Sequence, residues 1–357
     1  MKKLKIGVIF GGSSVEHEVS IDSAKTVCSS LRAGKHEIFP IYVDRKGGWH
    51  LVRFKDFTAE SEGGSEITLS PGRGNFIVRK RSLRLDAAFP VIHGTAGEDG
   101  TLQGLLEIMR IPYVGCGVAA SALGMDKILT KKIVQLEGLP VLKHVVVDSS
   151  NISGRQWVSD SVKMGFPLFV KPVALGSSVG VTKVKRPSEL ERAVMQALKY
   201  DSKAIVEKGV DKAREIVCGI LGTEFKARSS VCGEVAPGGL HEFYDYNAKY
   251  IDEHGFDFTL PARLSGSVSD KIRKTAEAIF KLAGCSGMAR VDFLVNPDRE
   301  KEFYFCEINT IPGFTSHSLY PRLWEATGLQ ISSLADELVR LALERHKDKQ
   351  KIRLIGK

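Results

Sequence analysis

The sequence predicts an α/β protein with two or three domains, and three observations support this prediction. At 357 residues the chain is too long for one ordinary compact core. The first 115 or so residues alternate short apolar strands with helices, an order typical of a parallel sheet. Further along, two strands are joined by a polar turn at 296–298. They carry acidic and amide side chains at positions where a strand usually has ordinary solvent-facing residues. We expect the C-terminal part to be of α+β type.

The composition excludes several classes of protein. Hydrophobic residues make up 43% of the chain and charged residues 26%, as in ordinary globular proteins. No run of about 18 apolar residues exists and the N-terminus lacks a secretory pattern, so we expect a cytoplasmic protein without a membrane partner. The six cysteines show no CxxC spacing, which predicts reduced core residues. The net charge of +9 comes from scattered lysines, which favours anionic nucleotides over nucleic acid.

The N-terminal pattern predicts a doubly wound sheet. A strand at 5–10 leads through a glycine-serine loop into a helix whose buried stripe includes Ala24, Val27 and Leu31. Strands follow at 36–43, 85–92 and 111–114, and we expect an irregular excursion at 55–80. In such sheets ligands sit at the carboxyl ends of strands, where the loops at 11–20 and 93–100 would lie. The acids of the first loop could equally be ordinary helix N-terminal residues.

The middle of the chain predicts a phosphate-binding loop. The pattern changes near 124–127, where we place a domain boundary, and a strand later ends at Lys171-Pro172. The loop at 174–180 offers backbone N–H groups and the hydroxyls of Ser177 and Ser178, although it is not a P-loop. A helix at 188–198 begins with the capping box Ser188 and Glu191. The strand at 204–208 ends in charged residues, and the strand from 214 begins with them. These charged residues either line the rim of a nucleotide pocket or simply reach water.

The last third predicts a lid and a metal site. The stretch 241–261 lacks a clean period and is rich in tyrosine, acid and glycine, which favours a lid. A helix at about 270–283 precedes the hairpin 288–319, in which period-two alternation places Glu307 and Asn309 on one face with Phe303 and Phe305 leading up to them. If the strands pair antiparallel, three oxygen ligands converge as Mg²⁺ requires: Asp292, Glu307 and Asn309. On these residues alone, a hairpin with a salt-bridged wet face is an equal alternative.

Eight segments in the same order resemble the D-alanine–D-alanine ligase family of ATP-grasp enzymes over nearly the whole chain. They are GGSSVEHEVS (11–20), HGTAGEDGTLQG (93–104), GMDK (124–127), FVKP (169–172), LGSSVG (175–180), FYDYNAKY (243–250), ARVDF (289–293) and EINTIPGFTSHSLYP (307–321). The resemblance implies an ATP-grasp fold with an N-terminal domain at 1–124, a central domain at 125–215 and a C-terminal domain at 216–357. It also implies that ATP and two D-alanines give D-alanyl-D-alanine through an acyl phosphate, in a homodimer formed through the N-terminal domain.

The resemblance also implies roles for individual residues. ATP would be bound by Lys127, Lys171, Ser177, Ser178, Glu207, Lys208, Val210, Glu215 and Lys249, and two Mg²⁺ or Mn²⁺ ions by Asp292, Glu307 and Asn309. Arg290 and the Gly313 amide would stabilise the oxyanion of the tetrahedral intermediate. The first D-alanine would meet Glu16 and His93, and the carboxylate of the second would meet Ser318 and the Leu319 amide.

Two features of the resemblance bear on substrate choice. Hydrogen bonds would link Glu16, Ser177 and Tyr250, and tyrosine at 250 favours D-alanine over D-lactate as second substrate. A related ATP-grasp ligase with a different amine substrate remains an alternative. The residues that would distinguish it are Glu16, Tyr250, Ser318 and Leu319. A second alternative is a nucleotide-binding regulatory protein without turnover, against which Arg290 and the three metal ligands argue.

Overall fold

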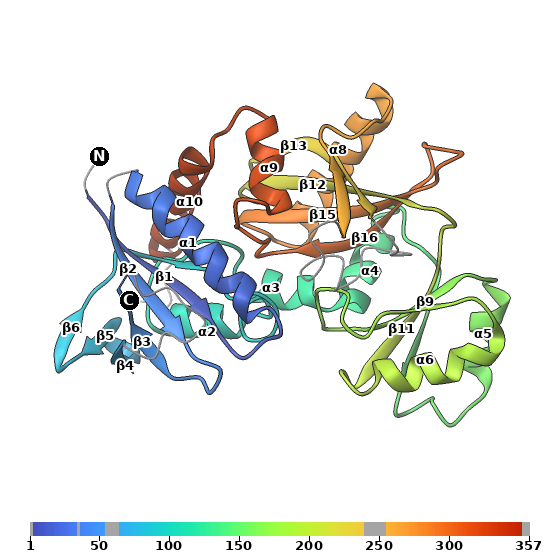
Figure 1. Ribbon diagram of the computed structural model, residues 1–357, viewed down its shortest axis with the longest axis horizontal. Helices are drawn as coiled ribbons and strands as arrows, with labels where there is room; N and C mark the ends of the chain where they lie inside the picture. The colour runs from blue at the N-terminus through green and yellow to red at the C-terminus, as the bar shows by residue number, and fades with distance from the viewer. Residues whose placement is uncertain (1–2, 34–35, 54–63, 239–254, 352–357) are drawn as a thin grey trace.

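The structure is a computed structural model that describes residues 3–33, 36–53, 64–238 and 255–351. The described strands form three sheets of seven, four and five strands. Figure 1 shows the first sheet at the left, the four-stranded sheet at the right and the five-stranded sheet between and above them. Among the described residues, no helix is both long and apolar enough to cross a membrane.

The N-terminal sheet has a parallel core with an antiparallel extension. Strand β1 (Lys5–Gly11) lies between β2 (Glu37–Val43) and β7 (Ala87–Pro90), parallel to both. The extension continues from β2 through β3 (Trp49–Leu51), β4 (Ser65–Ser70), β5 (Asn75–Val78) and β6 (Arg81–Leu83).

Two N-terminal expectations are corrected by these strands. Most of the described part of 55–80 is strand rather than irregular chain. The reason is that Ile67 and Phe76 are buried on one side of this sheet edge, which is otherwise polar and half-exposed. The strand expected at 111–114 is reduced to a single bridge between Tyr113 and Ala88, since the chain leaves the sheet edge after one contact.

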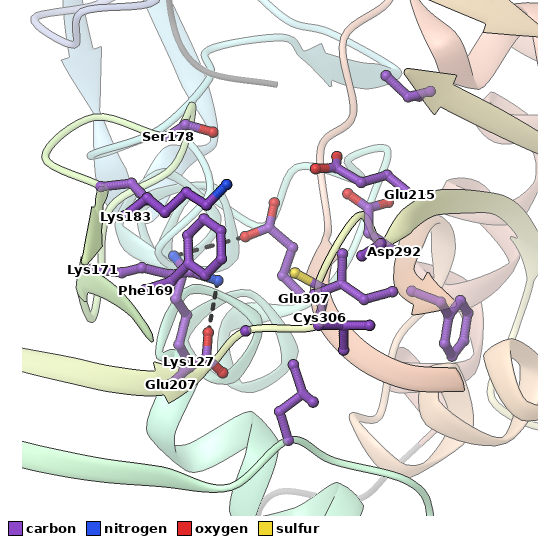
Figure 2. A pocket seen from close by; sticks show the side chains of 18 of the residues that line it. Lys127, Phe169, Lys171, Ser178, Lys183, Glu207, Glu215, Asp292, Cys306 and Glu307 are labelled. Atoms are coloured by element: carbon purple, nitrogen blue, oxygen red, sulfur yellow. Dashed lines mark ion pairs between the residues drawn. The ribbon is translucent and has the colours of Figure 1, made fainter. Parts of the chain in front are cut away.

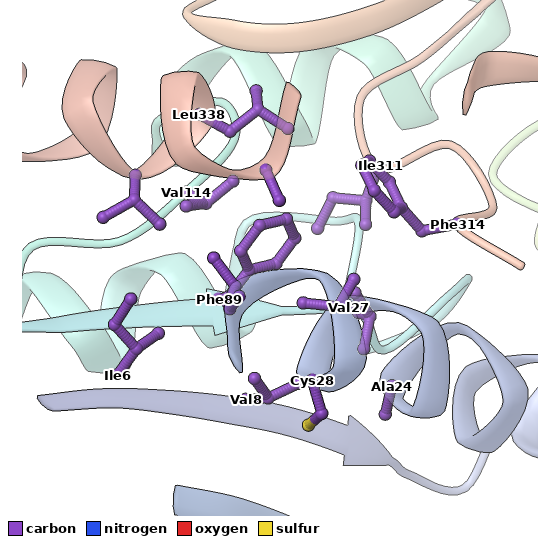
Figure 3. Close-up of a cluster of buried hydrophobic side chains, with 14 of the residues drawn as sticks. Ile6, Val8, Ala24, Val27, Cys28, Phe89, Val114, Ile311, Phe314 and Leu338 are labelled. Atoms are coloured by element: carbon purple, nitrogen blue, oxygen red, sulfur yellow. The ribbon is translucent and has the colours of Figure 1, made fainter. Parts of the chain in front are cut away.

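Helices cover both faces of the parallel core. On one face α1 (His17–Ala33) and α10 (Ile331–Lys351) pack on Ile6, Val8 and Phe10, and on the other α2 (Thr101–Ile108) packs on Ile9. This alternation follows from the period-two geometry of a strand. Figure 3 shows Phe89, Phe314 and Leu338 in the first of these cores, so the C-terminal helix shares a core with the first strand.

The four-stranded sheet separates an apolar face from a polar one. Its order is β10 (Thr182–Val184), β9 (Leu168–Pro172), β11 (Lys203–Lys208) and β8 (His144–Asp148), all antiparallel. Helices α5 (Gln156–Lys163) and α6 (Leu190–Ala197) cover the apolar face. The expected capping box at Ser188 is absent from the described chain, because a 3₁₀ turn, η3 (Pro187–Glu189), precedes α6 and the N-cap is Glu189.

Two short helices lead into this sheet. Helix α3 (Val118–Met125) is followed directly by α4 (Lys127–Leu136), whose N-cap Asp126 accepts hydrogen bonds from the N–H groups of Ile128 and Leu129, both at 2.9 Å. Helix α4 lies against the polar face of the sheet, where Ile128 packs on Ile205.

The five-stranded sheet carries the predicted hairpin. Its order is β14 (Phe256–Thr259), β13 (Ala227–Pro237), β12 (Arg214–Gly222), β15 (Gly287–Val295) and β16 (Phe303–Asn309). Helix α8 (Gly266–Leu282) covers one face and α9 (Leu319–Ala326) part of the other. Strand β12 starts at Arg214, shortly before the expected start of the C-terminal domain at 216, and the domain boundaries stay predictions.

Two further expectations about this part of the chain need comment. Most of the predicted lid at 241–261 lies outside the described residues, but Phe256–Thr259 pairs with β13 and is strand instead of irregular chain. The hairpin is antiparallel as expected, with a β-bulge at Cys306 because Asp292 lies opposite Glu307 and Phe293 opposite Phe305. The bulge turns Glu307 to the face opposite Phe303 and Phe305, which pack beneath α8, so the two phenylalanines do not share its face.

Candidate active site

Two cavities meet at the β15–β16 hairpin. The first, of about 380 Å³, lies between the four-stranded and five-stranded sheets. The second, of about 530 Å³, lies between the N-terminal loops and the five-stranded sheet. Five residues line both cavities: Lys127, Leu175, Arg290, Glu307 and Leu319. A molecule in either cavity would therefore reach the same few side chains.

The first cavity is lined by two lysine–glutamate pairs, which Figure 2 shows as dashed lines. Lys171 Nζ lies 2.6 Å from Glu207 Oε2, and Lys127 Nζ lies 3.9 Å from Glu307 Oε2. Burial would lower the pKa of Lys171, but Glu207 outweighs burial and raises it. Burial does lower the pKa of Lys127, because Glu307 offsets it only in part. Both ammoniums point to where an anion could bind.

Backbone donors complete the first cavity. Ser177 and Ser178 adopt φ of 55° and 58°, a left-handed conformation that is uncommon for non-glycine residues and clusters at functional sites. The Lys127 ammonium donates to the Leu175 carbonyl at 2.6 Å and so holds this loop over the N-terminus of α4. A helix N-terminus with adjacent loop N–H groups favours phosphate oxygens.

The rest of the first cavity matches the expected nucleotide contacts. Its lining includes the whole segment predicted to touch adenine and ribose, namely Glu207, Lys208, Val210 and Glu215. Glu207 is only 2% exposed, because its strand buries it between lysines instead of leaving it at the rim. Its contact with adenine stays a prediction.

The hairpin brings the three predicted metal ligands together. Asp292 lies opposite Glu307, and Asn309 lies opposite Arg290 on the same pair of strands. Arg290 donates to both oxygens of Asp292, at 2.8 and 2.7 Å. Asn309 Oδ1 accepts the Ile311 N–H at 3.0 Å.

This donor set fits Mg²⁺. Among the described residues no group of three His, Cys, Asp or Glu side chains suited to a metal exists. The predicted set differs from such a group in taking its third oxygen from the Asn309 amide. Two carboxylates and an amide, with phosphate oxygens and water, give the hard-oxygen coordination that Mg²⁺ requires.

The second cavity gathers acids around a buried histidine. Glu16, from the loop before α1, is 8% exposed, and a Cβ added at Gly94 would lie 3.1 Å from its Oε2. His93 Nδ1 donates to the Ile311 carbonyl at 3.0 Å and lies 3.4 Å from Glu98 Oε1. Burial would lower the pKa of His93, but Glu98 and Glu16 outweigh burial and raise it. The cluster suits a substrate that carries an ammonium group.

The far wall of the second cavity is the tail of the hairpin. Ser318 precedes α9 but does not cap it with its side chain. Its Oγ instead lies 2.8 Å from Thr315 Oγ1 and accepts the Thr315 N–H at 2.9 Å. A Cβ at Gly313 would lie 2.8 Å from this Oγ, so glycine leaves room for the hydroxyl.

Every predicted site residue that the structure describes lines one of the two cavities. Lys249 and Tyr250 lie outside the described residues. Sequence reasoning assigned no role to Phe169 and Lys183, which line the first cavity, or to Glu98, which lines the second. The loop 93–100 pointed to Glu98, whereas a lysine in a short strand such as Lys183 carries no signal of its own.

Comparisons with known proteins find matches over nearly the whole chain. Family models described as D-ala D-ala ligase N-terminus and C-terminus match residues 5–116 and 133–340. A D-alanine--D-alanine ligase of Thermoanaerobacter sp. (strain X514) is 44% identical over 98% of this chain and 99% of its own.

Solved structures give the same picture. The D-alanine-D-alanine ligase from Coxiella burnetii superposes with a TM-score of 0.87 at 38% identity, covering 98% of this chain and 97% of that one. The VanG D-Ala:D-Ser ligase from Enterococcus faecalis gives 0.85 at 36%, covering 96% and 100%.

Proposed function

The chain belongs to the D-alanine–D-alanine ligase family, and from this premise we infer that it joins two D-alanines in an ATP-dependent reaction. The first D-alanine carboxylate attacks the γ-phosphate of ATP, forming an acyl phosphate and ADP. The amine of the second D-alanine then attacks the acyl carbon, and phosphate leaves. The product, D-alanyl-D-alanine, is a precursor of peptidoglycan.

The observation that carries this proposal is the meeting of the two cavities at Arg290 and Glu307. ATP in the first cavity would place its phosphates near Lys127 and Lys171, under the loop of Ser177 and Ser178. Phosphoryl transfer depends mainly on such positioning and on charge neutralisation. The γ-phosphate would then lie at the boundary with the second cavity, where the attacking carboxylate binds.

Asp292, Glu307 and Asn309 would hold two Mg²⁺ or Mn²⁺ ions. When bound, these ions neutralise charge on the transferring phosphoryl group. Because Arg290 donates to both oxygens of Asp292, the same carboxylate would bind a metal ion and hold the guanidinium in place beside the substrate.

In the second cavity, Glu16 would bind the ammonium of the first D-alanine, with His93 beside it. The Arg290 guanidinium and the Gly313 N–H would stabilise the oxyanion of the tetrahedral intermediate. Ser318 Oγ and the Leu319 N–H would hold the second carboxylate. A homodimer, a cytoplasmic location and the lack of a nucleic-acid partner stay predictions of the sequence.

Phosphate release from ATP tests the proposal directly. We expect release with D-alanine and Mg²⁺ but not when L-alanine or D-lactate replaces D-alanine, and mass spectrometry should identify the dipeptide. Release that does not depend on D-alanine would refute the assignment. The likeness to a D-Ala:D-Ser ligase makes D-serine a necessary competitor in the same assay. If a mixed dipeptide formed in preference to D-alanyl-D-alanine, D-serine would replace D-alanine as the second substrate in the proposal.

A further inference from the structure

A buried lysine lies behind the first cavity. Lys131 sits on α4 one turn after Lys127, and its side chain is 1% exposed. It lines neither cavity, and the proposed function gives it no task. A buried ammonium costs several kcal/mol of desolvation unless close partners compensate it. Its position therefore needs a physical reason.

The Lys131 ammonium contacts both walls of the first cavity. Its Nζ lies 2.7 Å from Glu207 Oε1 on β11. It also donates to the carbonyls of Cys306 at 3.0 Å and Phe305 at 3.4 Å, on β16. These are the carbonyls at the bulge that turns Glu307 toward the cavity. One side chain thus ties the four-stranded sheet to the strand that carries a proposed metal ligand.

The Lys131 ammonium also changes the net charge at the first cavity. Glu207 divides its two oxygens between Lys131 at 2.7 Å and Lys171 at 2.6 Å, so the three groups together carry one net positive charge. Burial would raise the pKa of the Glu207 carboxyl, but the two lysines hold it well below its usual range. Without Lys131, Glu207 and Lys171 would form a closed neutral pair with little attraction for an anion.

We propose that Lys131 is a positioning residue for nucleotide binding, which occupies one oxygen of Glu207 so that Lys171 keeps its charge for the ATP phosphates. The proposal rests on the proposed function, because it requires Lys171 to be a phosphate ligand. It goes further by assigning the affinity for phosphates in part to a side chain that cannot touch ATP. The effect must therefore depend on phosphates and on Glu207.

Nucleotide binding to Lys131→Met tests this role. Methionine keeps the length and apolar stem of lysine, and Glu207 retains Lys171, so no buried charge is left unpaired. We expect binding of ATP and ADP to weaken about tenfold or more, the scale of one charged hydrogen bond. The inhibition constant of adenosine and the KM for D-alanine should stay within about twofold of wild type. Lys132→Met is the matched control, since this neighbouring lysine is exposed.

A second variant separates charge from packing. In Lys131→Met/Glu207→Gln, Lys171 no longer faces the Glu207 carboxylate, so ATP affinity should recover most of its loss. A purely structural role would weaken ATP and adenosine equally and would show no recovery, and either result overturns the proposal. Thermal melting checks folding. If Lys131→Met does not fold, Lys131→Gln replaces it, and a wild-type ratio of ATP to adenosine affinity there overturns the proposal as well.

The proposed function and this inference fail in different ways. Wild-type protein that binds ATP without D-alanine-dependent phosphate release refutes the ligase assignment but leaves the nucleotide comparison interpretable. Wild-type activity together with unchanged ATP binding in Lys131→Met refutes only the role of Lys131.

Discussion

At the scale of single residues, the guanidinium of Arg290 is oriented before any substrate binds. Two parallel hydrogen bonds to Asp292 fix its plane at the boundary of the two cavities. A donor fixed in advance stabilises developing negative charge without the cost of reorienting. Arg290 should therefore contribute to turnover more than to ATP binding.

Replacing Arg290 with alanine tests this division. We expect Arg290→Ala to bind ATP with nearly wild-type affinity while kcat falls about 10²-fold or more, because one oxyanion donor is lost. Calorimetry gives the affinity and phosphate release gives kcat. Arg299→Ala is the control, since this arginine of the same hairpin is 69% exposed and pairs with Glu302 in the turn. Turnover like that of wild type in Arg290→Ala would rule out the oxyanion role.

The resemblance described in the sequence analysis implies a role for Tyr250 in the choice of second substrate. We predict that Tyr250→Phe accepts D-lactate as the second substrate and forms a depsipeptide, because the phenolic hydroxyl would no longer position the site for an amine. Product analysis across a range of pH provides the measurement. Tyr304→Phe, on β16 outside both cavities, should leave specificity unchanged. Strict use of amines by Tyr250→Phe at every pH would contradict the assignment.

At the scale of elements, the segment after β16 has a glycine at a position where a side chain would collide with a neighbour. Gly313 has no left-handed φ, so alanine would fit its backbone, but the new Cβ would lie 2.8 Å from Ser318 Oγ. Thr315 holds that Oγ from two sides. Alanine at 313 would consequently displace the hydroxyl proposed to bind the second carboxylate.

This steric argument gives a prediction for the second substrate. In Gly313→Ala we expect KM for the second D-alanine to rise about tenfold, the effect of one weakened charged hydrogen bond, with little change in KM for ATP. Initial rates against D-alanine concentration at saturating ATP provide the test. Gly104→Ala, in α2 where a Cβ meets no atom within 4 Å, is the control. An unchanged KM in Gly313→Ala would show that Ser318 does not bind the carboxylate.

Elements also show what the sequence could and could not predict. The hairpin could be predicted because alternation and a polar turn are local features, so the pairing of Asp292 with Glu307 followed from the pattern. The bulge at Cys306 could not, because no local pattern marks it and the Cys306 carbonyl accepts a hydrogen bond from Lys131, which lies in a different part of the chain. The orientation of His17 could not be predicted from the sequence either. It stands beside Glu16 in the sequence, yet it turns into the core and contacts the Gly12 carbonyl at 2.5 Å.

At the scale of the whole molecule, the C-terminal helix fastens the N-terminal sheet to the five-stranded sheet. Arg345 of α10 donates to the carbonyls of Tyr113 and Gly115 and lies 4.3 Å over the Tyr113 ring. The Gly115 backbone in turn lies close to Gly287 of β15: a Cβ added at Gly287 would lie 3.0 Å from the Gly115 nitrogen. The second cavity lies between these bodies, so its shape depends on this contact.

A pH-dependent ion pair contributes to the same contact. Glu107 of α2 accepts the Tyr113 hydroxyl at 2.7 Å and pairs with Lys349 of α10. Burial would raise the pKa of the Glu107 carboxyl, but Lys349 and Tyr113 hold it below its usual value of 4.5. Because the folded state lowers this pKa, the stabilisation is fully present above about pH 4.5 and is lost as pH falls through the lower folded value.

Glu107→Gln should therefore lower the melting temperature at neutral pH by a few degrees at most, since the pair is partly exposed. Glutamine keeps an acceptor for Tyr113 and removes only the titrating charge. The difference in melting temperature from wild type should shrink as pH falls below 4.5, where the wild-type carboxyl becomes protonated. Glu344→Gln is the control, because Glu344 pairs with Arg340 within α10 and spans no boundary. A difference that grows toward low pH would mean that Glu107 opposes the docking of α10.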